Sequence, residues 1–199
     1  MEKLAQKIAQ YVRKNEEKYT ELSRKIWEYA ELAFREEKSA AALIDLMKDE
    51  GFSVETDLAG IPTAFVARYG SGKPVIGFLA EYDALAGLDQ VSGVTSQQGI
   101  AGKDGHGCGH HLLGVGALGA AIATKRYLEQ TGKSGTVILY GCPGEEGGSG
   151  KTFMAREGVF DGCDFALTWH PSSFNAYLSG GSLANYQIQY RFYGQAAHA

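Results

Sequence analysis

Apolar positions near the start of the chain recur at the spacing of amphipathic helices. The pattern appears three times before residue 50, so we predict three helices that each bury one apolar face. The "EGF" at 50–52 places a glycine where the third helix would end. The positions that carry the pattern are Leu4, Ile8, Tyr11 and Val12, then Leu22, Ile26, Tyr29 and Ala30, then Leu43, Leu46 and Met47.

Further along the chain the apolar positions become consecutive, which is typical of strands that are buried on both faces. We predict strands within "TAFVARYG", "PVIGFLAEYD", "GTVILYGCP" and "CDFALTWHP". The "GSGK" at 70–73 lacks the spacing of a phosphate-binding loop and predicts a hairpin turn. Helices are expected from about His111 to Glu129 and within "TFMAREGVF". This alternation predicts an α/β fold in which helices surround a mainly parallel sheet.

Two segments depart from this alternation. Residues 86–109 are rich in glycine and polar side chains and have no periodicity, which predicts a long loop of the kind that is often functional. From about residue 181, the stretch "SLANYQIQYRFYG" alternates apolar and polar side chains, as a half-exposed strand does. We therefore predict one domain over residues 1–180 and the first strand of a second domain over residues 181–199.

Composition and charge narrow the function classes. The net charge is −4 and the chain has no basic block, so we expect no nucleic-acid partner. No apolar run approaches the length of a membrane span, and the charged N-terminal stretch lacks the core of a signal peptide. We therefore expect a cytoplasmic protein without a membrane partner. The three cysteines are an odd number, which favours free thiols or metal ligands, and Cys142 and Cys163 are expected to pack in apolar surroundings.

The stretch "HGCGHH" at 106–111 holds three of the five histidines. Cys108 and His110 are separated by one glycine, and the glycines permit backbone dihedrals that turn both side chains the same way. A thiolate and an imidazole together suit Zn²⁺ and similar borderline metal ions. The alternative is a loop with a buried thiol and solvated histidines, but the density of ligand types favours a metal site. His106 and His111 are expected to support that site rather than to bind the metal.

Three further sets of polar side chains follow predicted strands: Glu81 with Asp83, Glu145 with Glu146, and His170. Ligands of open α/β sheets bind at the carboxyl ends of the strands, so we expect these sets to converge. One of the adjacent glutamates could bind a metal while the other takes a proton as general base, although a solvated pair at a helix start is the alternative. His170 is expected as a metal ligand rather than a core histidine. Asp83 could bind a metal directly or orient a histidine that does.

The motifs as a set resemble the aminoacylase/carboxypeptidase-like metallopeptidases, and within them the amidohydrolase subgroup. The resemblance covers nearly the whole chain and implies a zinc-peptidase-like catalytic domain that is interrupted by an α+β dimerisation, or lid, domain. The stretches that carry it are "IPTAFVARYGSGKPVIGFLAEYDALAGL", "GHGCGHHLLGVGALGAAIA", "YGCPGEEGGSGKTFMAREGVF", "ALTWHP" and "SLANYQIQYRFYGQAAHA".

The resemblance also implies a site for two divalent metal ions, Zn²⁺ or Mn²⁺. Glu145 falls on the general base of the family. His198, in "AAHA", falls in the dimerisation domain, where it would reach a partner subunit's site and contact the substrate or the developing oxyanion. The positions that match the family's metal ligands are Cys108, His110, Glu146 and His170.

The activity implied by the resemblance is hydrolysis of the amide bond of a small N-acyl amino acid or a dipeptide-like substrate, in a homodimer or a heterodimer. Family members are longer, and their catalytic domain resumes after the dimerisation domain to supply a further histidine ligand. One alternative is therefore a truncated, non-catalytic fragment or partner subunit. Another is an aminoacylase or a dipeptidase that shares the same metal chemistry.

Overall fold

The computed structural model describes residues 2–177 and, beyond them, positions 180–181, 183–184, 186, 188, 190–191 and 193–194. The helices are α1 (Glu2–Lys14), α2 (Glu16–Tyr29), α3 (Glu37–Asp49), α4 (His110–Thr131), α5 (Glu145–Gly148) and α6 (Gly150–Arg156). The strands are β1 (Ser53–Leu58), β2 (Ile61–Ser71), β3 (Val75–Ala80), β4 (Gly135–Gly141) and β5 (Phe165–Leu167). The three helices that the periodicity predicts before residue 50 are confirmed as α1, α2 and α3.

The five strands form one sheet in the order β1-β2-β4-β3-β5. β3 runs parallel to β4 and to β5, whereas β2 runs antiparallel to β1 and to β4. The predicted α/β class is confirmed, and the parallel strands are the ones whose carboxyl ends precede the candidate site residues. β1 was not among the predicted strands, because "SVETDL" is mostly polar and mostly exposed.

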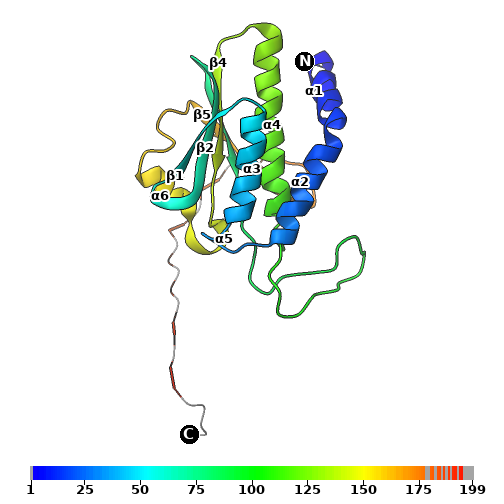
Figure 1. Ribbon diagram of the computed structural model, residues 1–199, viewed down its shortest axis with the longest axis vertical. Coiled ribbons are helices and arrows are strands. Elements are labelled where there is room, and N and C mark those ends of the chain that lie inside the picture. The colour runs from blue at the N-terminus through cyan, green and yellow to red at the C-terminus, as the bar shows by residue number, and fades with distance from the viewer. Residues whose placement is uncertain are drawn as a thin grey trace.

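Helices cover both faces of this sheet (Figure 1). α2, α3 and α4 pack on one face, where Ile26, Leu43 and Leu118 belong to the larger apolar core. α6 lies against the other face, where Met154 packs with Ile138 in a smaller core. All positions of β4 are buried, as the run of apolar residues predicts for a central strand.

Glycines bring α4 close to the end of β3. A Cβ atom at Gly114 would lie 2.6 Å from the carbonyl oxygen of Glu81, so a larger residue would push the helix away from the strand. Gly109 precedes α4 with φ of 87°, a left-handed conformation that glycine adopts without strain. Together they place His110, the first residue of α4, beside the segment that follows β3.

The prediction of a hairpin turn at 70–73 is wrong, because β4 lies between β2 and β3. The turn instead lies against the residues that begin β4, where the Ser134 hydroxyl donates a hydrogen bond to the carbonyl of Ser71. The predicted strand over residues 181–199 includes many positions outside the described residues, so the second domain stays a prediction. Among the described helices, none has both the length and the apolar character that crossing a bilayer requires.

Gly114→Ala should lower the free energy of unfolding by about 1–3 kcal/mol, because the added methyl group overlaps the backbone after β3. Gly119→Ala is a matched control in the same helix: it is also buried, but its added Cβ would meet nothing closer than a Tyr19 ring carbon at 3.9 Å. The control should be neutral or stabilising by up to about 1 kcal/mol, since alanine favours helices over glycine. Urea unfolding measures both, and equal effects would contradict the close approach.

Candidate metal centre

The candidate residues converge at the carboxyl ends of the parallel strands. Glu81 and Asp83 follow β3, and Glu145 and Glu146 begin α5 shortly after β4. His170 follows β5. The long loop before α4 supplies the remaining candidates from the neighbouring helix start. Segments that are far apart in the sequence therefore meet at one edge of the sheet, as expected of a ligand site in an α/β fold.

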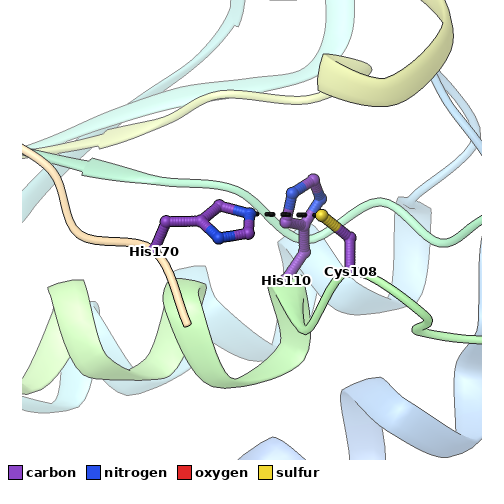
Figure 2. Close-up of side chains that lie close together, drawn as sticks. All are labelled: Cys108, His110 and His170. Carbon is purple, nitrogen blue, oxygen red and sulfur yellow. Dashed lines mark hydrogen bonds between the residues drawn. The ribbon is translucent and has the colours of Figure 1, made fainter. Parts of the chain in front are cut away.

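Cys108, His110 and His170 form a cluster that one ion could bridge (Figure 2). The Sγ of Cys108 lies 3.1 Å from the Nε2 of His170. The rings of His110 and His170 meet edge to face, with their centroids 6.0 Å apart. One ligand atom from each of the three residues lies within 4.8 Å of the others. His110 is buried whereas His170 is exposed, so the cluster opens from the interior towards solvent.

The Asp83 carboxylate fixes the His110 ring and the backbone of Glu146. His110 Nδ1 lies 2.9 Å from Asp83 Oδ1, and it must donate this hydrogen bond because a carboxylate only accepts. The backbone N–H of Glu146 donates to the other oxygen, Oδ2, over 2.9 Å. In the neutral ring, a proton on Nδ1 leaves the Nε2 lone pair available to a metal. Of the two roles that the sequence left open for Asp83, the contacts favour the orienting one.

A group of carboxylates surrounds the same histidine from the other side. Glu81 Oε2 lies 3.1 Å from His110 Nε2, and Glu145 Oε2 and Glu146 Oε1 each lie 3.8 Å from it. Ligand atoms of Glu81, His110 and Glu145 all lie within 4.8 Å of one another. His110 is thus shared by this carboxylate group and the Cys108 cluster, and the arrangement could hold two neighbouring cations.

The negative charge at this edge changes the proton affinities of the site. Burial, together with the charge of Glu81, raises the pKa of Glu145. Burial and the neighbouring Glu146 raise the pKa of the Cys108 thiol to about 12. Burial by itself lowers the pKa of His110, but its hydrogen bond to Asp83 and the surrounding carboxylates outweigh burial and raise it. The thiol therefore keeps its proton at neutral pH until a cation displaces it.

Two buried atoms test whether a cation fits this site. His110 Nε2 and Glu146 Oε1 have no hydrogen-bond partner among the described residues. They lie 3.8 Å apart, which is close to the separation of two ligands that each lie about 2.0–2.2 Å from one zinc ion. Leaving both atoms unpaired is unfavourable, and a bound cation would satisfy both. With the thiol, these nitrogen and oxygen donors fit a divalent ion such as Zn²⁺ or Mn²⁺.

His106 and His111 contact each other rather than the candidate ligands. Their ring centroids lie 5.0 Å apart, and His106 Nε2 lies 3.0 Å from the carbonyl oxygen of Ile26. Burial lowers the pKa of both histidines. Neither belongs to a metal-compatible group within the described residues, consistent with the supporting role predicted for them.

Glu81 and Lys151 are site residues to which the sequence analysis gave no role. The Nζ of Lys151 donates a hydrogen bond to Glu81 Oε1 over 2.5 Å and places a positive charge beside the carboxylates. The position of Glu81 after a buried strand was a usable signal, whereas Lys151 looks like any lysine of a short helix. His198 lies outside the described residues, so its contact with a partner subunit stays a prediction.

The fold and the site together define a class of metallopeptidase, and sequence comparison agrees. The family model for peptidase family M20/M25/M40 matches residues 77–192, and the chain belongs to this family. The resemblance inferred from the motifs is therefore confirmed.

Individual relatives are longer than this chain. The p-aminobenzoyl-glutamate hydrolase of Escherichia coli (strain K12) has one subunit that is 50% identical over 200 residues, which span 100% of this chain and 42% of that protein. The Xaa-Arg dipeptidase of Mus musculus is 31% identical over 213 residues, 100% of this chain and 45% of that protein. A dinuclear metal binding peptidase of the M20 family from Bacillus subtilis shares the fold, with a TM-score of 0.62 and 23% identity over 78% of this chain and 42% of that structure. The chain spans less than half the length of each.

The metal-free chain should lose stability in acid because of its buried histidines. Burial, and then the charges of His106 and His110, lower the pKa of His111 from 6.5 to about 4. The unfolded state therefore binds a proton that the folded state resists, so this contribution is present above pH 6.5 and is lost as the pH falls towards 4.

Replacement of this histidine tests the sign of the effect. His111→Gln should reduce the loss of unfolding free energy between about pH 7 and pH 5 by on the order of 1–2 kcal/mol. Urea unfolding with a chelator present measures the difference. A pH dependence that is the same in the variant and the parent would contradict the assignment.

Proposed function

We propose that this chain carries the metal-binding and proton-transfer residues of an amidohydrolase that cleaves the amide bond of an N-acyl amino acid such as p-aminobenzoyl-glutamate. The observation that carries the proposal is the position of His110, shared between a Cys–His–His group and a carboxylate group at one sheet edge. The family membership supports a hydrolase. The half-identical Escherichia coli relative supports this substrate among the small molecules of the family.

The cations are two divalent ions, Zn²⁺ or Mn²⁺, because the donors combine sulfur, nitrogen and oxygen around a shared histidine. Bound there, the cations supply Lewis acidity that makes a water molecule more acidic and an amide carbonyl more electrophilic. Asp83 holds the His110 ring with its Nε2 facing the ions. The residues that would hold the ions are Cys108, His110, Glu146 and His170.

Glu145 is the general base in this mechanism. Its side chain is 41% exposed, which lets it face a substrate, and its raised pKa favours uptake of a proton from the attacking water. The hydroxyl of that water adds to the carbonyl carbon. As the C–N bond breaks, Glu145 returns the proton to the nitrogen of the leaving amine. The products are a carboxylate and a free amine, and the carboxylate of Glu145 is regenerated.

The assembly of the whole protein is part of the proposal. His198 contacts the substrate or the oxyanion in a partner subunit's site, and the protein acts as a homodimer or a heterodimer in the cytoplasm. The name of the Escherichia coli relative, which describes one subunit of a hydrolase, supports an assembly of more than one chain.

Two alternatives are separable by experiment. A dipeptidase is favoured by the 31% identity to the mouse Xaa-Arg dipeptidase, and a panel of dipeptides and N-acyl amino acids distinguishes it from an amidohydrolase. A non-catalytic fragment or partner subunit is favoured by the 42% share of the Escherichia coli relative that the chain spans. Metal analysis together with an amidase assay decides, since two tightly bound metal ions with turnover favour the enzyme.

Glu145→Gln should lower kcat by about 10²–10⁴-fold in the assembled enzyme while leaving its metal content unchanged, because the amide cannot take a proton from water. Glu157→Gln is the control, since Glu157 pairs with Arg156 at an exposed position after α6. Steady-state kinetics and metal analysis measure the two effects. Full turnover by the Glu145 variant would refute its role as base.

Asp83→Asn should weaken metal binding by about 10–100-fold, because the amide no longer offers two acceptors to His110 and to the Glu146 backbone. Asp104→Asn is a control in the loop before α4, where Asp104 accepts a hydrogen bond from the Gly87 backbone. Titration with Zn²⁺ or Mn²⁺ gives both affinities. If the two variants bind equally well, Asp83 does not orient a ligand.

A further inference from the structure

The loop that joins α2 to α3, residues 30–36, contacts two of the strand ends that carry the candidate site. The carbonyl of Glu31 accepts a hydrogen bond from the Ala84 backbone N–H over 2.8 Å, just after β3. The ring of Phe34 packs against α5 so closely that a Cβ atom at Gly148 would lie 2.0 Å from it. Ala30 and Phe34 have φ of 43° and 64°, values that are costly for residues other than glycine. The surrounding contacts therefore hold this loop in a conformation that it would not favour alone.

Glu36 is the residue of this loop that reaches furthest into the protein. It is 0% exposed, and its carboxylate accepts three hydrogen bonds from three segments. Its Oε1 accepts from the backbone N–H groups of Phe34, over 2.9 Å, and of Gly144, over 2.8 Å. Its Oε2 accepts from the Thr63 hydroxyl at the start of β2, over 3.0 Å. A carboxylate is buried at an acceptable cost only when its oxygens are paired in this way.

Gly144 directly precedes the two glutamates of the candidate site. It has φ of 63° and ψ of 39°, and a Cβ atom there would lie 2.6 Å from the Phe34 ring. The N–H groups at the start of a helix have no partner within that helix, so Gly144 needs an external acceptor. Glu36 supplies it, while Asp83 accepts from the Glu146 N–H two residues further along. The start of α5 is thus held at two successive points by two carboxylates.

We propose that Glu36 is a positioning residue, whose buried carboxylate fixes the Gly144 turn and thereby aims Glu145 and Glu146 at His110. The consequence for metal binding and proton transfer rests on the proposed function, whereas the anchoring of the turn does not. Burial raises the pKa of Glu36, so the position does not depend on a negative charge. A neutral acceptor of the same shape should therefore serve as well.

Glu31 provides a matched control within the same loop. Its carboxylate accepts from the backbone N–H groups of Lys38 and Ser39 and from the Ser39 hydroxyl, over 2.8–3.0 Å. It therefore also accepts three hydrogen bonds, but at the start of α3 rather than at the start of α5. Its side-chain removal should cost stability without releasing the Gly144 turn.

The experiment compares Glu36→Ala, Glu36→Gln and Glu31→Ala in the 199-residue chain. Hydrogen exchange of the Gly144 amide, followed by NMR, should accelerate at least about 10-fold in Glu36→Ala and stay as in the parent in the other two. Titration with Zn²⁺ should give an affinity about 10–100-fold weaker for Glu36→Ala, as for other groups that orient ligands, and near-parent affinity for the other two. Urea unfolding identifies general destabilisation, which both alanine variants should share.

The outcomes separate this inference from the proposed function. Equal losses of metal affinity in the two alanine variants, or failure of Glu36→Gln to restore affinity, would overturn the positioning role. If the parent binds no metal at all, the proposed function fails, and the Gly144 amide then decides the anchoring. Unchanged exchange of that amide in Glu36→Ala would refute the anchoring.

Discussion

The candidate site depends on one carboxylate, that of Asp83, which joins the two segments that bring ligands to the sheet edge. One oxygen accepts from the His110 ring at the start of α4, and the other accepts from the Glu146 backbone at the start of α5. Both contacts require α4 to lie close against the end of β3, which Gly114 permits. The distance between the shared histidine and the carboxylates is therefore set by backbone packing as much as by the ligands themselves. Such support is what metal sites need beyond their direct ligands.

The parts of the fold that the sequence predicted are those whose burial leaves a periodic pattern. α2 and α3 bury one face, and β4 is buried on both faces, so each shows the expected spacing of apolar residues. β1 is mostly exposed and exists by pairing with β2, so its own residues carry little signal. The turn at 70–73 was misread because strand order is a non-local property. Nothing around that turn shows that β4 enters between the strands it connects.

The site was predictable where residue type and position after a strand coincide. Cys108, His110 and His170 combine ligand chemistry with such positions, and the structure brings them together. Glu36 could not be found in this way, because in "FREEKS" it has the same appearance as the neighbouring Glu37. Its burial follows from the places of Thr63 and Gly144, which are distant in the sequence. Support of this kind is written in tertiary contacts, whereas ligands are written in residue type.

The central claim is that a thiolate and imidazoles from separate segments bind one divalent ion at the sheet edge. X-ray absorption spectroscopy of the zinc-loaded chain tests it most directly. The account predicts a sulfur ligand at about 2.3 Å and nitrogen ligands at about 2.0–2.1 Å, with the sulfur lost in Cys108→Ser. A zinc environment without sulfur, or one whose sulfur persists in that variant, would contradict it.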